Sequence, residues 1–493
     1  MKVRRVRTLL MVAVLGVGSL GSTAFVSAAE SETAAAPAYK IDFSPCPGSA
    51  NVQCGTLRVP ADWAAPKGPK ITVAVARRPA DDPAHRIGTL FYNPGGPGDP
   101  ATDNVIAADT FFSATLRARF DIVGVDPRGV GGSTPITCGV PPLTPEYTFF
   151  PRTQAAFDAM VAHNRAVARS CLQQTGPLFL HADTVSVARD HEAVRIALGV
   201  SKVNWLGLSY GTQVGAQYAA LYPKRTRAIV LDAALDHSSP EVQLTADATK
   251  TVEEAFDRFA DWCDTAADCV LRGQDVRAVY DKLVRDADAN PIPVEGALRP
   301  VSGDDIRMNT PNWLAAKTPN VLAGELSWPV FSEVLRRAVA GDAQFFAFPA
   351  PGGPVDVILA SRIANHCGDY VADIHTFAEM QQRIEMGRQL APHLQGGSEF
   401  WQGGFCIGWP FKVANPQRSL DVKGVPTLIV HSTHDPSVSY QWAFGLAAQI
   451  RGSSVLSRIG DGHTSYYTSD CARDATDQFL LTTRSTPAPV CAT

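Results

Sequence analysis

Short runs of apolar residues recur along the chain, and longer segments with apolar residues at helical spacing lie between several of them. Some runs, such as 122–125 and 427–430, show no alternation with polar residues. Uninterrupted runs of this length are typical of strands that are buried on both faces of a sheet. The pattern predicts strands at ITVAVARR (71–78), IGTLFYN (87–93), FDIVGVD (120–126), VNWLGL (203–208), RAIVLDA (227–233), VPTLIVH (425–431) and SVLSRI (454–459).

Helical spacing is clear at 187–198 and 213–221, which lie between predicted strands. Strands that alternate with helices in this way usually form a parallel sheet. We therefore expect an α/β fold with a mostly parallel sheet and helices on both of its faces.

The alternation stops near Asp236 and resumes near Val425. In this interval VEEAFDRFADWC (252–263) and WPVFSEVLRRAVAG (328–341) have apolar residues at helical spacing. The simplest interpretation is a large, mainly helical insertion that caps the sheet. The expected division of the chain is a signal peptide (1–29), a linker (30–40), a first core part (41–238), the cap insertion (239–422) and a second core part (423–493).

The N-terminus, MKVRRVRTLLMVAVLGVGSLGSTAFVSAAES, has the parts of a secretory signal. Basic residues precede a short apolar segment at 9–17, and small residues at 26–28 suit signal peptidase. A retained membrane anchor is the alternative, and no later stretch is apolar over a length that spans a bilayer. We expect a secreted protein with no stable membrane association after signal removal.

Composition and cysteine usage agree with an exported globular protein. The chain is 45% hydrophobic and 19% charged, and its net charge of -4 with no later basic run excludes a nucleic-acid partner. The 10 cysteines are even in number, several are close in sequence, and no paired CxxC pattern indicates zinc. The spacing does not fix their connectivity. We expect a monomer with the disulfides Cys46–Cys54, Cys138–Cys171, Cys263–Cys269, Cys367–Cys406 and Cys471–Cys491.

The segment GLSYGT (207–212) places Ser209 between two glycines, after a predicted strand and before a predicted helix. This is the context in which G-x-S-x-G holds a nucleophilic serine on a strained turn. Flanking glycines are expected to permit that turn without Cβ clashes. An ordinary strand-to-helix corner is the alternative, because the short motif is common.

A second glycine-rich loop, PGGPG (94–98), follows another predicted strand. Glycines there let a main-chain N–H approach a substrate oxygen, and a tetrahedral oxyanion needs two such donors. We expect the N–H groups of Gly96 and Tyr210 to form this oxyanion hole. The alternative is a plain turn between strand and helix.

A serine nucleophile needs a histidine base and an orienting carboxylate. His463 lies in a glycine-flanked loop after the last predicted strand, and Asp435 lies just past another. The order Ser209, Asp435, His463 is the chain order of an α/β-hydrolase. Asp232, directly after the apolar run AIVL (228–231), is the rival acid.

Two other motifs suggest different chemistry. His431, His434 and Asp435 resemble metal ligands, but no third ligand cluster and no HExxH accompany them. We expect no metal. The loop DPRGVGGS (126–133) lacks the lysine of a P-loop and the spacing of a dinucleotide site, so we expect it to shape the rim of the site.

Five motifs together resemble the secreted tripeptidyl aminopeptidases of actinomycete type, which are α/β-hydrolase serine exopeptidases related to prolyl iminopeptidases. The resemblance covers nearly the whole mature chain, including CGTLRVPADW (54–63) and CARDATDQFL (471–480). Pro94 takes the place of the histidine in the HGGPG motif of prolyl iminopeptidases. The motifs are NPGGPG (93–98), DPRGVGGS (126–133), GLSYGT (207–212), HDPS (434–437) and GDGHTS (460–465).

The resemblance implies Ser209 as nucleophile, Asp435 as acid, His463 as base, no cofactor, and a cap that admits only a few N-terminal residues. It also implies an acidic residue near the cap for the free amine, for which Asp369 is the candidate. An exposed acid or a structural hydrogen bond is the alternative for Asp369. Asp99 stands where the family usually has glycine, and DPSVS (435–439) replaces the more usual DPxTP, which affects the expected substrate preference.

The expected activity is release of short peptides, tripeptides in the family, from peptide or protein N-termini. A secreted esterase or lactonase is the second hypothesis, because the same triad serves both reactions. A hydrolase-like binding protein without catalysis is the third.

Overall fold

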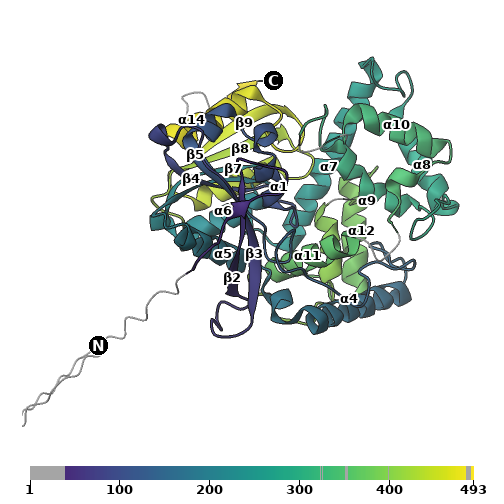
Figure 1. The fold of residues 1–493 in the computed structure, drawn as a ribbon. Coiled ribbons are helices and arrows are strands. Elements are labelled where there is room, and N and C mark those ends of the chain that lie inside the picture. The colour runs from purple at the N-terminus through teal and green to yellow at the C-terminus, as the bar shows by residue number, and fades with distance from the viewer. Residues whose placement is uncertain are drawn as a thin grey trace, which may run out of the picture. The chain divides into compact units, whose positions relative to one another are not determined.

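The computed structural model describes residues 39–321, 324, 326–349, 354–397, 399–484 and 490–492 (Figure 1). The predicted signal peptide and the predicted linker up to residue 38 lie outside the described residues.

The strands of the described residues form one sheet in the order β1-β2-β3-β5-β4-β6-β7-β8-β9-β10. Pairs from β5 through β10 are parallel, whereas β1, β2 and β3 form an antiparallel margin. The predicted α/β class with a mostly parallel sheet is thereby confirmed. The strands are β1 (Ser44–Pro45), β2 (Gln53–Pro60), β3 (Lys70–Arg78), β4 (Gly88–Asn93), β5 (Phe120–Val125), β6 (Val203–Leu208), β7 (Thr226–Asp232), β8 (Thr427–His434), β9 (Ser454–Asp461) and β10 (Val490–Ala492).

The central strands are buried on both faces, and this explains their uninterrupted apolar runs. In β6, Trp205 belongs to the hydrophobic cluster on one face and Leu206 to the cluster on the other. In β4, Phe91 belongs to the same cluster as Trp205, and Leu90 belongs to the same cluster as Leu206. The sequence pattern missed β1, β2 and β10, which lie at the margins of the sheet and are short or alternate between apolar and exposed residues.

Helices cover both faces of the sheet (Figure 1). Residues of α5, α6 and α13 join the cluster that contains Trp205, and residues of α1, α3 and α14 join the cluster that contains Leu206. These helices and the short α2 are α1 (Ala101–Ile106), α2 (Ala108–Phe111), α3 (Ala114–Arg119), α5 (Thr184–Ala197), α6 (Tyr210–Leu221), α13 (Tyr440–Gln449) and α14 (Asp470–Thr482).

Between β7 and β8 the chain forms a mainly helical segment, which has a hydrophobic cluster of its own around Phe256, Tyr280 and Phe331. Helix α4 (Gln154–Thr175), from the first core part, packs against α12, with the rings of Phe157 and Phe377 6.1 Å apart. The helices of the insertion are α7 (Glu241–Thr265), α8 (Val276–Ala289), α9 (Gly303–Leu314), α10 (Trp328–Val339), α11 (Pro354–Asp369) and α12 (Phe377–Leu390).

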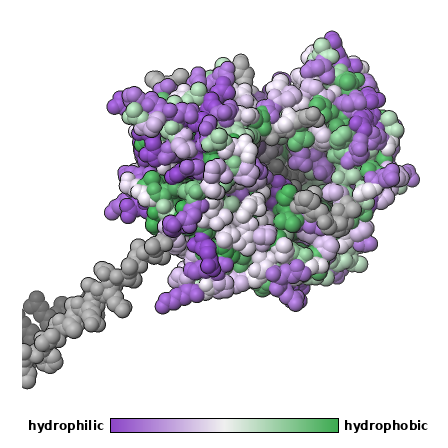
Figure 2. Space-filling model, in the orientation of Figure 1, coloured by the Kyte–Doolittle hydropathy of each residue, from purple (hydrophilic) through white to green (hydrophobic). Residues whose placement is uncertain are grey.

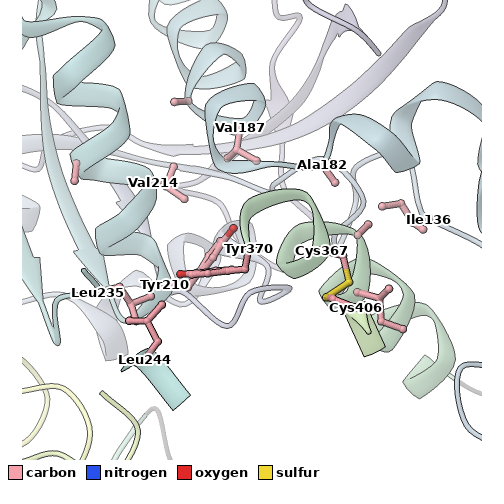
Figure 3. Close-up of a cluster of buried hydrophobic side chains, with 14 of the residues drawn as sticks. Ile136, Ala182, Val187, Tyr210, Val214, Leu235, Leu244, Cys367, Tyr370 and Cys406 are labelled. Carbon is pink, nitrogen blue, oxygen red and sulfur yellow. A yellow bond between two sulfur atoms is a disulfide. The ribbon is translucent and has the colours of Figure 1, made fainter. Parts of the chain in front are cut away.

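Disulfides link several of these elements, and the cysteine pairs in the structure are the same as those expected from the sequence. Cys471–Cys491 ties α14 to β10, and Cys367–Cys406 ties α11 to the 3-10 segment Glu399–Cys406. Figure 3 shows the second of these bonds at the end of α11. Structural disulfides are typical of proteins outside the reducing cytosol. The other pairs are Cys46–Cys54, Cys138–Cys171 and Cys263–Cys269.

Within the described ranges, no helix combines the length and the apolar character needed to cross a membrane.

Candidate active site

Ser209 lies on a tight turn between β6 and α6. Its backbone has φ 52° and ψ -125°, a conformation that is uncommon for a residue with a side chain. Hydrogen bonds on both sides hold this conformation: its N–H donates to Asp232 O at 2.9 Å, and the Thr212 hydroxyl donates to its carbonyl at 2.6 Å. The turn fixes the serine at the start of α6, where unpaired N–H groups and the helix dipole favour negative charge.

The glycines that flank the serine are required for space. Neither Gly207 nor Gly211 has a positive φ, so the left-handed backbone is carried by Ser209 itself. A Cβ on Gly207 would lie 2.3 Å from Gly211 O, and a Cβ on Gly211 would lie 2.4 Å from Asn93 O. These short distances agree with the expectation that the flanking glycines permit the turn without Cβ clashes. The atoms that a Cβ would meet belong to α6 and to the end of β4.

The loop after β4 lies directly against this turn. Gly95 and Gly96 have φ of +107° and +101°, which favours glycine at both positions. A Cβ on Gly95 would lie 2.6 Å from Leu208 O and 3.0 Å from Tyr210 N. Gly96 and Tyr210, the two residues whose N–H groups are the predicted oxyanion donors, line the same cavity as Ser209.

His463 and Asp435 are hydrogen-bonded to each other. Nδ1 of His463 lies 2.9 Å from both carboxylate oxygens of Asp435, which is 1% exposed. Burial opposes ionisation of Asp435, but the charge and hydrogen bond of His463 outweigh it and lower the pKa of Asp435. An ionised Asp435 keeps the proton of His463 on Nδ1 and leaves Nε2 as the proton acceptor.

Asp232, the rival acid, is engaged elsewhere. Its carboxylate accepts the main-chain N–H groups of Ser465 at 2.8 Å and Tyr466 at 2.7 Å. Burial raises its pKa to about 6. Asp435, and not Asp232, is the carboxylate at Nδ1 of His463.

The loop that carries His463 also contacts the insertion. The N–H of His463 donates to Ala315 O at 2.7 Å, immediately after α9. Two residues away, Asp461 forms ion pairs with Arg258 of α7 and with Lys317. The position of the histidine therefore depends on the insertion as well as on the sheet.

A cavity of about 260 Å³ brings Ser209, His463, Gly96 and Tyr210 together. Figure 2 shows this face of the molecule hollowed between the sheet and the insertion. Much of its wall comes from one face of α11, which the sequence analysis did not single out. The signal was present, because the lining residues of α11 follow helical spacing: Leu359, Arg362, Ile363 and His366.

The cavity wall carries one pair of opposite charges. Asp99 lines it next to the glycine loop, and a carboxylate oxygen lies 3.9 Å from an Arg362 nitrogen. Arg362 also donates from Nε to Pro97 O at 3.0 Å, so α11 is bonded to the loop that contains Gly96. The departure at Asp99 therefore changes the charge at the cavity wall.

Asp369 is not brought to the cavity. It is fully buried, and its carboxylate accepts hydrogen bonds from Thr184 N at 3.1 Å, Asn415 Nδ2 at 2.7 Å and the Tyr210 hydroxyl at 2.5 Å. Figure 3 shows Tyr210 beside Tyr370, which follows Asp369. The geometry fits the alternative of a structural hydrogen bond, here from Tyr210 at the start of α6 to Asp369 at the end of α11.

The suspected metal ligands have other partners. Both ring nitrogens of His431 are engaged, since Nδ1 accepts from Ala234 N at 3.1 Å and Nε2 lies 3.1 Å from Val438 O. His434 lies 2.7 Å from a Glu254 carboxylate oxygen. Across the residues that the structure describes, no group of three or more His, Cys, Asp or Glu side chains is arranged to hold a metal ion.

The loop at 126–133 is held by buried polar contacts. Arg128 is fully buried and forms two hydrogen bonds with Asp190, at 2.7 and 2.6 Å. Asp126 accepts N–H groups from Thr102 and Gly132, each at 2.9 Å. These contacts are structural, and Ser361 of α11 meets the loop by donating to Gly129 O at 2.5 Å.

A family model of the α/β hydrolase fold matches residues 88–470. The chain belongs to this family. The match extends from the first residue of β4 across the insertion to the first residue of α14, and it includes every residue of the site described above.

Similar proteins include both peptidases and an esterase. The chain is 31% identical over 465 residues to the serine protease Hip1 of Mycobacterium tuberculosis, covering 88% of this chain and 87% of that protein. It is 31% identical over 472 residues to a tripeptidyl aminopeptidase of Streptomyces lividans, covering 90% and 85%. It is also 31% identical over 468 residues to carboxylesterase B of Mycobacterium tuberculosis, covering 87% and 84%. The chain is therefore a serine hydrolase, and the percentage identity alone does not separate peptides from esters as substrates.

Proposed function

We propose that this protein is a secreted serine exopeptidase that releases short peptides, tripeptides in the first instance, from free N-termini. The observation that carries the proposal is a serine, a histidine and a carboxylate at strand ends, below a cavity whose wall is supplied largely by the insertion. The resemblance to tripeptidyl aminopeptidases and the similarity to proteins named tripeptidyl aminopeptidase and serine protease support the same conclusion. Structural disulfides and the signal-like N-terminus support export.

The proposed chemistry is acyl transfer to Ser209. His463 Nε2 removes the hydroxyl proton as the serine oxygen attacks the scissile carbonyl carbon, and Asp435 stabilises the imidazolium that forms. The N–H groups of Gly96 and Tyr210 bind the oxyanion of the tetrahedral intermediate. His463 then gives its proton to the leaving amine, and the C–N bond breaks. Water attacks the acyl-enzyme by the same steps and releases the short peptide.

The insertion supports an exopeptidase over an endopeptidase. Cavity-lining residues come from α9, from α11 and from the segment that ends at Cys406, all within the insertion. Contacts with Ala315 and Arg362 fix this wall against the histidine loop and the glycine loop. A wall fixed so close to Ser209 leaves room for a chain end more readily than for the middle of a long polypeptide.

A secreted esterase or lactonase is the second candidate, favoured by the similarity to carboxylesterase B. Ester hydrolysis uses the same triad and oxyanion donors, and only the leaving group differs. The two candidates therefore differ in what the cavity wall recognises.

A peptide panel separates these candidates. The purified protein is assayed on fluorogenic mono-, di- and tripeptide amides with free or acetylated N-termini, and on matched p-nitrophenyl esters. We expect kcat/KM for the free tripeptide amide to exceed that for its acetylated form by at least about tenfold, the effect of roughly 1.4 kcal/mol of selective binding. Equal rates on free and blocked peptides, or turnover of esters only, would contradict the exopeptidase proposal.

Asp369 gives a further prediction about how the free amine is recognised. Asp369→Ala leaves Thr184 N, the Tyr210 hydroxyl and Asn415 without their buried acceptor, so we expect a loss of about 3 kcal/mol in the free energy of unfolding. We expect the ratio of kcat/KM for free and acetylated tripeptides to change by less than about threefold. Urea denaturation and the same two substrates provide the measurements. A collapsed ratio with unchanged stability would instead assign Asp369 to amine binding.

A further inference from the structure

Asp232 connects the nucleophile to the loop of the base. It is the last residue of β7, beside β6, which ends one residue before Ser209. Its main-chain carbonyl accepts the N–H of Ser209 at 2.9 Å. Its side chain accepts the N–H of Ser465 at 3.0 and 2.8 Å and that of Tyr466 at 2.7 Å. One residue thereby contacts both parts of the site that must meet for proton transfer.

The loop that it holds is strained. Thr464, directly after His463, has φ +63°, and a β-branched residue in this left-handed region is an outlier. Such a conformation costs of order 1–3 kcal/mol and persists only when the surrounding contacts impose it. The strain occurs at the residue next to the base, so any relaxation of this loop displaces the imidazole.

Two carboxylates impose this conformation. The N–H of Thr464 donates to Asp435 at 3.3 Å, and the next two N–H groups, of Ser465 and Tyr466, donate to Asp232. Three consecutive N–H groups are therefore divided between the acid that orients the ring and a second buried acid. Asp232 is 1% exposed, so solvent does not replace these hydrogen bonds when they are lost.

Arg458 binds the other side of the loop. It is buried, and it donates to Gly462 O at 2.9 Å and to Asp461 O at 3.0 Å. These bonds hold the residues before His463, and a further bond from Arg458 Nε to Ser465 Oγ at 3.3 Å reaches the side that Asp232 holds. The position of the imidazole along the loop depends on both.

We propose that Asp232 is a positioning residue that sets the place of the His463 base relative to Ser209, while Asp435 orients the imidazole ring. The proposal rests on the proposed triad but not on the choice between peptide and ester substrates. It gives a role to the second strand-end carboxylate that is separate from that of the acid at Nδ1.

Asp232→Asn tests this role with little change in volume. The single amide oxygen replaces only one of the two carboxylate oxygens, so the NH₂ group faces the N–H of Ser465, which contacts both oxygens in the wild type. The main-chain bond to Ser209 is kept. On the fastest substrate, we expect kcat to fall about 100-fold with KM changed by less than about threefold, because the defect lies in proton transfer and not in binding. In the His463→Ala background, the same substitution is expected to lower the residual rate by less than about threefold. Groups that act as one unit show this lack of additivity.

Asp126→Asn is the matched control. Asp126 is also a buried acid just past a strand end, and its carboxylate holds a loop through the N–H groups of Thr102 and Gly132. It does not contact the histidine loop in the hydrogen bonds described above, so we expect kcat within about threefold of the wild type. Where Asp232→Asn does not fold, Asp232→Glu, which moves the carboxylate by one methylene, gives the same comparison.

A second variant checks the role of backbone strain. Asn adopts the left-handed region more readily than Thr. The double variant Asp232→Asn, Thr464→Asn is therefore expected to have a kcat at least about threefold higher than Asp232→Asn alone. Equal losses in the wild-type and His463→Ala backgrounds, or an equal loss in Asp126→Asn, would overturn the proposal and leave Asp232 a structural residue. A wrong assignment of the triad would give a different result, because His463→Ala would then retain wild-type activity.

Discussion

Replacement of Ser209 by alanine is expected to lower kcat by at least about 10⁴-fold on every substrate that the wild type cleaves. Without the hydroxyl no acyl-enzyme forms, and the remaining rate comes from the oxyanion donors and binding alone. The measurement is the hydrolysis rate of the best peptide amide and of the best ester, together with covalent labelling by a fluorophosphonate probe. Labelling and turnover should be lost together.

The fold of this variant is expected to be intact. The hydrogen bonds that hold the turn are made by the main chain of Ser209, with Asp232 O and with the side chain and N–H of Thr212, and alanine keeps them. The matched control is Ser332→Ala, a buried serine of α10 that does not line the cavity and is expected to be labelled at the wild-type rate. Activity or labelling within tenfold of wild type in Ser209→Ala would contradict the nucleophile assignment. Absence of turnover and of labelling in the wild type would instead favour the hypothesis of a non-catalytic binding protein.

The sequence predicted the sheet and the order of the site residues because both depend on local signals. A strand buried on both faces has no polar position to interrupt its apolar run, and parallel strands end at one edge, so residues just past them converge. His463 and Asp435 are 28 residues apart in sequence, yet the hydrogen bond between them follows from their places after adjacent strands. The five cysteine pairings were chosen largely on closeness in sequence, and the structure joins the same pairs.

What the sequence did not predict depends on packing between distant segments. Asp369 is the amine ligand that the resemblance suggests, but Thr184 and Asn415, which surround it, are 185 and 46 residues away in sequence. The packing of α4 against α12 is likewise a contact between segments that are far apart in the sequence. The sequence indicated that Gly207 avoids a Cβ clash, but the atom that a Cβ would meet, Gly211 O, depends on the packing of the turn.

The insertion contacts the two loops to which the proposed mechanism assigns the base and an oxyanion donor. It supplies part of the cavity wall through α11, and it meets these loops through Arg362 at Pro97 O and Ala315 at the N–H of His463. Substitutions in the insertion are therefore expected to alter kcat together with KM. A wall that only bound substrate would change KM alone.

A substitution in the glycine-rich loop after β4 (94–98) is expected to have the second large effect on kcat. Gly95→Ala places a Cβ 2.6 Å from Leu208 O and 2.9 Å from the Cβ of Ser209, at a φ of +107° that alanine rarely adopts. The loop must move away from the nucleophile turn, and the N–H of Gly96 moves with it. We expect kcat to fall about 10²- to 10³-fold with a small change in KM, because an oxyanion donor acts in the transition state more than in the ground state. We also expect a loss of about 2–4 kcal/mol in the free energy of unfolding.

Gly95→Ala has two effects, an unfavourable φ and a steric clash, and Gly199→Ala separates them. Gly199 also has a positive φ, of +68°, but no atom lies within 4 Å of the added Cβ. Its expected cost is the conformational part alone, about 1–2 kcal/mol, with kcat unchanged. Steady-state kinetics and urea denaturation of both variants provide the comparison. If Gly95→Ala kept kcat within threefold while losing stability, the loop after β4 would be a plain structural turn, and the second oxyanion donor would have to come from another part of the cavity wall. If both stability and kcat fell in Gly95→Ala and only stability fell in Gly199→Ala, the close contact between the loop and the nucleophile turn would be the cause of the catalytic loss.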